Sequence, residues 1–197
     1  MESIGGNLAY GDQHYCPYYC EENIWHLCRS SSLSFYPRFV LTIGNARRSA
    51  IFWSQKLSSH PDIPIRWDYH MVLIARKTGQ PWVIYDFDSF CDFPSEAGQY
   101  FDRTFRSLPR QLSDCVPRFR LIRAEDFLRF FHSDRSHMRK LDGTWIHPPP
   151  KWPAIINNGG SRYGLADLID LRQSQPGWVG NLSQLRAKLN SIGYPVE

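Results

Sequence analysis

Two runs of β-forming residues, separated by a short turn, constrain the fold of this chain more than any other feature. The runs cover residues 66–76 and 81–87, and both are rich in aromatic and β-branched side chains. Between them lies Lys77-Thr78-Gly79-Gln80, where glycine can adopt the left-handed backbone that tight turns require. This pattern is typical of a β-hairpin, so we expect two paired antiparallel strands here.

The rest of the chain mixes helical and strand patterns without a regular alternation. Apolar periodicity and capping residues predict helices over 21–30, 45–57 (capped by Asn45), 96–108, 124–132, 165–171 and 183–191, and strands over 39–43 and 119–123. This mixture favours an α+β fold with a mostly antiparallel sheet flanked by helices. At 197 residues we expect a single domain over 1–197, with residues 1–14 as a partly ordered lead-in.

Charge and hydropathy argue against two classes of partner. The net charge is +4, but the arginines are scattered, and their densest group, at 103–123, is interrupted by acidic and apolar residues. Because there is no basic stripe and no recognition motif, we expect no nucleic-acid partner. No apolar run approaches the length needed to cross a bilayer, so we expect no membrane partner either.

The cysteines are typical of a reducing compartment. The chain has five, an odd number, and residues 1–6 have neither the basic nor the apolar region of a secretory signal. We therefore expect free thiols and a cytoplasmic location, with the nucleus as a second location. We expect no structural zinc and no other metal or cofactor, because no paired Cys-x-x-Cys spacing joins the cluster of His14, Cys16, Cys20 and Cys28.

Cys20 is the strongest candidate for a reacting group. It is followed by two acids, an amide and an apolar periodicity, which predicts a thiol at the N-terminus of a helix. The unpaired backbone N–H groups and the helix dipole at such a position favour a thiolate over a thiol. A thiolate nucleophile also needs a base within hydrogen-bond reach and a group that orients the base.

The predicted hairpin carries candidates for the base and its partner. His70 lies in the first run, and Asp86 and Asp88 lie at the end of the second. A turn centred on Thr78 places His70 opposite Asp86. A turn centred on Gly79 places His70 opposite Asp88 instead, on the same face of the sheet. A two-residue turn would put both acids on the other face, so the hypothesis requires an odd-length loop or a bulge.

The order of cysteine, histidine and aspartate is that of papain-like and transglutaminase-like enzymes. The pattern alone has an equally good structural explanation, in which Cys20 is a buried core cysteine and His70 a core histidine satisfied by a neighbour. A binding module without enzymatic activity therefore stays open at this point, and it predicts that blocking Cys20 leaves function intact.

Five segments of the chain resemble the protein N-terminal glutamine amidohydrolase family. They are, in the family's order, Cys20-Glu21-Glu22-Asn23-Ile24-Trp25, Trp67-Asp68-Tyr69-His70, Tyr85-Asp86-Phe87-Asp88, Ser133-Asp134-Arg135-Ser136-His137-Met138 and Pro148-Pro149-Pro150. The resemblance runs from Tyr15 to Trp178, whereas 92–111 and the extreme N-terminus match poorly. It implies a papain-like or transglutaminase-like core with the catalytic cysteine at the start of a helix.

The resemblance also implies a reaction and a set of roles. The family's Cys-His-Asp triad maps onto Cys20, His70 and Asp86. The implied enzyme is a monomer that deamidates the N-terminal glutamine of a protein or peptide to glutamate through a Cys20 thioester, releasing ammonia. The product would feed N-degron protein degradation. A papain-like cysteine peptidase and a transglutaminase-like acyltransferase would use the same three residues, and both stay as alternatives.

Two parts of such a substrate need partners of their own. A carboxylate would bind the free α-ammonium group, and the candidates are Glu21, Asp88 and Asp134, with Asp68 a weaker one. Each of these acids also has an ordinary structural explanation as a helix, strand-end or loop residue. The backbone N–H of Cys20 is the expected oxyanion donor, and the sequence identifies no second donor.

Overall fold

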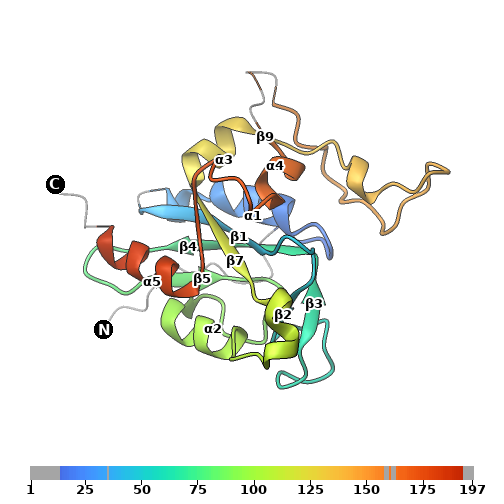
Figure 1. The fold of residues 1–197 in the computed structure, drawn as a ribbon. Helices are drawn as coiled ribbons and strands as arrows, with labels where there is room; N and C mark the ends of the chain where they lie inside the picture. Colours follow the sequence, from blue (N-terminus) through green and yellow to red (C-terminus); the bar gives the residue numbers. More distant parts are fainter. Residues whose placement is uncertain (1–13, 35, 158–159, 161–162, 193–197) are drawn as a thin grey trace.

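The computed structural model describes residues 14–34, 36–157, 160 and 163–192 (Figure 1). The predicted lead-in, 1–14, lies outside these residues except for its last position. The centre of the fold is a six-stranded sheet made of β1 (Arg38–Gly44), β4 (Tyr69–Ala75), β5 (Val83–Tyr85), β6 (Ser95–Glu96), β7 (Arg118–Arg123) and β10 (Trp178–Gly180). Its order is β10-β7-β1-β4-β5-β6, and every pair is antiparallel.

Helices and two small sheets complete the described structure. The α-helices are α1 (Cys20–Cys28), α2 (Ala97–Thr104), α3 (Ala124–Phe130), α4 (Leu165–Ile169) and α5 (Leu182–Ser191). Short 3₁₀ helices are η2 (Ser31–Leu33), η3 (Arg110–Cys115) and η4 (Ser136–Met138). Strand β2 (Ala50–Phe52) pairs with β3 (Ile65–Trp67), and β8 (Phe131–His132) pairs with β9 (Tyr163–Gly164). Within the described residues, no helix is both long and apolar enough to span a membrane.

The central sheet is covered on both faces, which gives the molecule two hydrophobic clusters. Helices α1, α3 and α4 lie on one face, and α2 and α5 lie on the other (Figure 1). Successive side chains of a strand point to opposite faces, so β4 feeds both clusters. Met71 and Leu73 pack beneath α1, while Val72 and Ile74 pack toward α2. All seven residues of β4 are buried, so this strand lies in the interior of the fold.

The predicted fold class and hairpin are confirmed. The structure is a mixed α+β fold with a mostly antiparallel sheet and flanking helices. Leu73 pairs with Tyr85 and Ala75 with Val83, which centres the hairpin on Gly79, whose φ is +75°. The loop therefore has the odd length that puts His70 and the acids after β5 on one face. All five cysteines are free, as predicted.

The predicted helix over 45–57 is wrong. The chain makes a tight turn after Asn45, whose side-chain Oδ1 accepts the backbone N–H groups of Arg47 and Ser49 at 3.1 and 3.0 Å. It then forms β2, which pairs with β3 and is wholly buried. The residue read as a helix cap thus caps a turn, because Asn serves both structures with the same side-chain acceptor. Burial of this apolar run in a strand pair outweighs its helical spacing.

The first predicted strand of the hairpin is divided into two. Asp68 accepts the backbone N–H of Tyr69 at 2.9 Å and separates β3 from β4. The residues before Asp68 pair with β2 and those after it pair with β1 and β5. The break leaves Asp68 exposed where β4 begins. This end of β4 is where the functional side chains meet.

Candidate active site

A cavity of about 300 Å³ lies where α1 and β4 begin. Its size is at the lower end of the range for small-ligand pockets. The wall includes Tyr18, Cys20, Asp68, His70, Asp88 and His137. The sequence-predicted nucleophile and base therefore face one space, although they come from segments fifty residues apart.

Cys20 is the first residue of α1, and only 8 % of its surface is exposed. The backbone N–H of Met71 on β4 hydrogen-bonds its sulfur. Burial raises the pKa of the Cys20 thiol well above its usual value, and the neighbouring acids Glu21, Asp88 and Asp68 raise it further. The helix start was expected to favour a thiolate, but burial and three carboxylates favour the protonated thiol in this environment.

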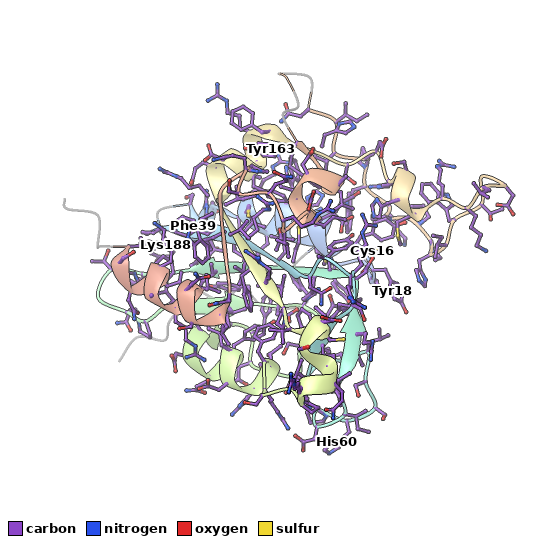
Figure 2. All side chains as sticks on the ribbon, viewed as in Figure 1. Cys16, Tyr18, Phe39, His60, Tyr163 and Lys188 are labelled. Carbon is purple, nitrogen blue, oxygen red and sulfur yellow. The ribbon has the colours of Figure 1, made fainter. Side chains whose placement is uncertain are left out.

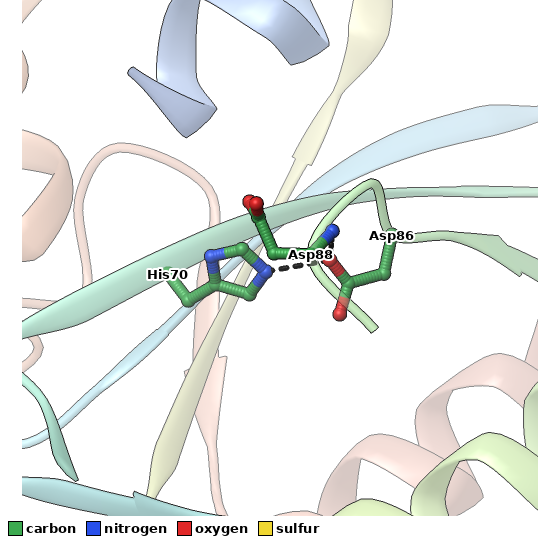
Figure 3. Close-up of side chains that lie close together, drawn as sticks. All are labelled: His70, Asp86 and Asp88. Carbon is green, nitrogen blue, oxygen red and sulfur yellow. Dashed lines mark hydrogen bonds and ion pairs between the residues drawn. The ribbon is translucent and has the colours of Figure 1, made fainter. Parts of the chain in front are cut away.

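His70 is held by Asp86 and turned so that one ring nitrogen stays available. Its Nε2 lies 2.7 Å from Asp86 Oδ1 (Figure 3). Its ring stacks on Trp67 with the centroids 5.3 Å apart. His70 Nδ1 is buried and has no hydrogen-bond partner among the described residues. In the neutral ring the geometry assigns the proton to Nε2 and leaves the buried Nδ1 as an acceptor.

Asp86 is buried in a complete set of donors. Besides His70, it accepts the hydroxyl of Tyr100 at 2.8 Å, the amide of Gln55 at 3.3 Å and the backbone N–H of Asp88 at 3.0 Å. Burial works to raise the pKa of Asp86, but the charge and hydrogen bond of His70 lower it overall. Burial likewise works to lower the pKa of His70, and the charge of Asp86 raises it overall. Each group thus favours the charged form of the other, so Asp86 stabilises the imidazolium when His70 accepts a proton.

The nucleophile and base candidates come from opposite layers of the molecule. Cys20 belongs to the cluster beneath α1. His70 points to the other face, where its ring meets Phe52 edge-on and its partner Asp86 meets Tyr100 of α2. The β4–β5 ladder ends at Leu73, so at His70 strand β4 is paired with β1 on one side and has no ladder partner on the β5 side. The site is therefore assembled at the end of a strand, where both layers reach the same cavity.

Asp88 is a second carboxylate beside the imidazole. It lines the cavity, is half-buried, and accepts the hydroxyl of Tyr15 at 2.6 Å. Burial raises its pKa, and the charge of Asp86 adds to the increase. His70, Asp86 and Asp88 each offer a ligand atom within 4.8 Å of the others, which makes them the one set in the described residues that could hold a metal ion (Figure 3). Hydrogen bonds already engage the facing atoms of His70 and Asp86.

Glu21 lies behind the cavity wall. Its carboxylate is completely buried, accepts the hydroxyl of Tyr69 at 3.0 Å and lies 3.7 Å from the Cys20 sulfur. Its Oε1 is 3.4 Å from His137 Nε2, and the His137 ring is on the wall with 27 % of its side chain exposed. Glu21 therefore affects the cavity through its charge and through its contacts with Tyr69 and His137.

The structure does not bring Asp134 into the cavity. This exposed carboxylate accepts the backbone N–H of Ser136 at 2.9 Å, and that bond lowers its pKa. It lines a separate neighbouring hollow. Asp68, the weaker candidate, does line the cavity. Of the four acids considered from sequence, two are on the wall, one is behind it and one is outside.

A buried ion pair explains the motif that contains Asp134. Arg135 donates Nε–H and Nη2–H to the two oxygens of Glu22, each at 2.8 Å, and Glu22 also accepts Trp152 Nε1–H at 2.7 Å. These bonds tie α1 to the segment 133–152, whose residues form one wall of the cavity. The segment 133–138, noted above for its resemblance, thus contributes a support of the site through Arg135.

Sequence reasoning missed several residues that shape the site. Tyr100 and Gln55, which bind Asp86, lie in segments to which no role was given. Trp67 and His137 lie inside recognised motifs, but no residue pattern distinguished them from their neighbours. The position of Trp67 and His137 inside these motifs was the signal that could have identified them. Nothing in the sequence pointed to Tyr100 and Gln55, because only folding brings α2 and the segment that follows β2 to the end of β5.

Comparison with known proteins gives consistent matches over most of the chain. A sequence model described as N-terminal glutamine amidase matches residues 15–190. A curated protein named protein N-terminal glutamine amidohydrolase, from Bos taurus, is 37 % identical over 182 residues, covering 89 % of this chain and 86 % of its own. Proteins of the same name from Homo sapiens and Drosophila melanogaster are 36 % and 34 % identical, covering 90 % and 88 % of this chain and 88 % and 86 % of their own.

Proposed function

This chain belongs to the N-terminal glutamine amidase family, and on that premise we propose that it hydrolyses the side-chain amide of an N-terminal glutamine in a peptide or protein. The products are an N-terminal glutamate and ammonia. The observation that supports this reaction in the molecule itself is a cavity shared by a cysteine and a histidine that is hydrogen-bonded to a buried aspartate. We further propose that Cys20, His70 and Asp86 form the catalytic triad.

The first half of the reaction forms a thioester. The thiol proton passes from Cys20 to His70 Nδ1, the nitrogen without a partner, while Asp86 stabilises the imidazolium. The sulfur bonds to the carboxamide carbon, and the backbone N–H of Cys20 at the start of α1 stabilises the oxyanion. Collapse of the intermediate breaks the C–N bond, and His70 returns its proton to the departing ammonia.

The second half regenerates the enzyme. Neutral His70 takes a proton from water, whose oxygen bonds to the thioester carbon. The C–S bond then breaks, and His70 returns the proton to the sulfur, leaving a glutamate side chain. The sum of both halves is one amide and one water giving one carboxylic acid and one ammonia. Asp86 keeps the ring in the required tautomer throughout, because its own hydrogen bonds hold it in place.

The surroundings of the cavity support a polypeptide substrate. A groove of about 690 Å³ lies next to the cavity and is lined mainly by aromatic rings and by the prolines at 148–150. Tyr18 and His147, whose stacked rings have centroids 3.6 Å apart, line both spaces. Figure 2 shows Cys16 and Tyr18 close together on this side of the molecule. We place the residues that follow the glutamine along this groove.

The cellular role follows the same proposal. An N-terminal glutamate is a precursor of a degradation signal, so the enzyme would feed N-degron protein degradation. We propose that it acts as a monomer in the cytoplasm, with the nucleus as a second location, and as a single catalytic domain.

Four peptides test the proposed reaction. Ammonia release is measured enzymatically from Gln-X, acetyl-Gln-X, X-Gln and Asn-X peptides of equal length. We expect only the first to react. Acetylation removes the α-ammonium, and in X-Gln the glutamine is no longer the N-terminal residue. Asparagine is one methylene shorter, so its carbonyl does not reach Cys20. Equal release from acetyl-Gln-X would contradict specificity for a chain terminus.

Two variants test the roles of the cysteine and histidine. Cys20→Ala and His70→Ala should abolish ammonia release while circular dichroism and the urea midpoint show a folded protein. The typical loss for a residue of such a triad is about 10⁴-fold or more. Turnover by either variant within tenfold of wild type would refute the assignment.

The product distinguishes the alternative enzymes. A papain-like peptidase would cleave the backbone of the Gln-X peptide, and a transglutaminase-like acyltransferase would join it to an added primary amine. Mass spectrometry of the reaction with and without the amine separates these outcomes from simple deamidation. A binding module predicts that alkylated Cys20 leaves peptide binding unchanged.

A further inference from the structure

The nucleophile of this site is surrounded by negative charge. Glu21 lies 3.7 Å from the Cys20 sulfur, and Asp68 and Asp88 share the cavity wall with it. Arg48 is the one arginine or lysine among the described residues that line the cavity, and its side chain is exposed. A cluster of carboxylates opposes the formation of a thiolate, so the arrangement is unfavourable for the unoccupied enzyme.

The titratable groups around Cys20 come from each element at the cavity. Besides the three acids and Arg48, the cavity contains or adjoins Tyr18, Tyr69, His70, His137 and His147, and Lys56 acts on Asp88. His70 is engaged by Asp86, and His137 lies beside the buried Glu21. The charges of His70 and Lys56 act on Asp88 and work to lower its pKa, but burial and the charge of Asp86 outweigh them. The open wall therefore fits a ligand that carries a positive charge.

We propose, on the basis of the function proposed above, that the substrate's α-ammonium group binds at Asp88 and that its arrival promotes transfer of the Cys20 proton. The cation compensates the carboxylates, so that the nucleophile becomes active only when a free chain terminus is in place. A peptide without the ammonium group would enter the same cavity and meet a protonated thiol.

The geometry selects Asp88 over the other acids. Four bonds separate the carboxamide carbon of glutamine from its α-nitrogen, a span of about 5 Å. Asp88 lines the same cavity as Cys20 and has a carboxylate oxygen within 4.8 Å of a His70 ring nitrogen, so an ammonium group at Asp88 lies beside the proposed catalytic groups. Tyr15 fixes the carboxylate by a 2.6 Å hydrogen bond. Glu21 is sealed behind the wall, and Asp68 is exposed to solvent, where water screens its charge.

The expected effect is large enough to measure. A unit charge about 5 Å from the sulfur, at an effective dielectric constant of about 20, changes the thiolate population on the order of a hundredfold. Iodoacetamide reacts with the thiolate and not with the thiol, so its rate at neutral pH reports that population. A Cys20→Ala sample identifies the contribution of the other four cysteines.

The first experiment uses two small ligands that differ by an acetyl group, which removes the positive charge of the amine. Glycinamide carries the α-ammonium, and N-acetylglycinamide does not; neither has a side chain that would fill the space at Cys20. We expect saturating glycinamide to speed alkylation of Cys20 at pH 7 by tenfold or more, and N-acetylglycinamide to leave the rate unchanged. If Cys20 is alkylated at the same rate with glycinamide, with N-acetylglycinamide and without any ligand, the proposal is overturned. This measurement uses the wild-type enzyme and needs no turnover.

The second experiment removes the charge at Asp88. Asp88→Asn should speed alkylation of the free enzyme, abolish its response to glycinamide, and lower kcat/KM for Gln-X peptides by tenfold or more. A purely structural role would not make Cys20 more reactive while lowering activity. Asp134→Asn, outside the cavity, is the matched control and should change none of these quantities.

The two experiments separate this proposal from the proposed function. Suppose that the wild type releases ammonia from Gln-X, but that neither glycinamide nor Asp88→Asn changes the alkylation rate of Cys20. This result refutes the proposed effect of the ammonium group and leaves the proposed deamidation intact. A response of Cys20 to glycinamide without any release of ammonia refutes the deamidation and leaves an ammonium site beside a reactive cysteine.

Discussion

Removing Arg135 should destabilise this protein more than any surface ion-pair substitution. The guanidinium makes two 2.8 Å hydrogen bonds to Glu22, whose carboxylate is completely buried and has further donors in Trp152 and Ser133. Arg135→Met leaves that charge without its cation inside the protein. Loss of one partner of a buried pair costs about 3–5 kcal/mol, a large share of the roughly 5–15 kcal/mol that holds a domain folded.

The assay is urea unfolding followed by tryptophan fluorescence, with the free energy of unfolding extrapolated to water. Arg47→Met is the matched control, because its 2.8 Å pair with Asp114 is mostly exposed and should contribute less than about 1 kcal/mol. The double variant with Glu22→Leu and Arg135→Met should lose less than the sum of the single variants, since no charge is left unpaired. An Arg135→Met loss within about 1 kcal/mol of the Arg47→Met loss would refute the reasoning.

Three further predictions follow from other contacts of the described residues. Tyr100→Phe removes one of the hydrogen bonds that fix Asp86 and should lower kcat about tenfold, measured by ammonia release, with little change in KM. The His70–Asp86 pair should stabilise the fold most between about pH 4 and 6.5. Asp86, with a lowered pKa, loses its contribution as the pH falls through its folded value, and His70, with a raised pKa, loses its contribution as the pH rises through its own. The stability difference between wild type and Asp86→Asn in urea should therefore be larger at pH 5.5 than at pH 9; an equal difference would contradict the ion pair. Burial raises the pKa of Cys28 to about 12, so mass spectrometry should find it unmodified after alkylation of the native protein at pH 8 and modified after unfolding.

The sequence by itself determined the elements with strong local patterns. The hairpin could be predicted because Gly79 supplies a turn with positive φ between two β-forming runs. The sequence also showed that the loop must have an odd length, or contain a bulge, if His70 and Asp86 are to lie on the same face, and the loop is odd in length. The start of α1 at Cys20 could be predicted because acids and apolar periodicity mark a helix N-terminus. The segment after Asn45 was misread because one side chain caps a helix or a turn equally well.

Only the tertiary structure decided the charge state and surroundings of the reacting groups. A helix start favours a thiolate locally, yet the pKa of Cys20 is raised, because burial and carboxylates from three different segments act on it together. Tyr100 reaches Asp86 from α2, and no sequence pattern links the two. Electrostatic energy depends on distances in space and on burial, which separate segments acquire only when the chain folds. Local pattern therefore identified the reacting side chains, and packing set the conditions under which they react.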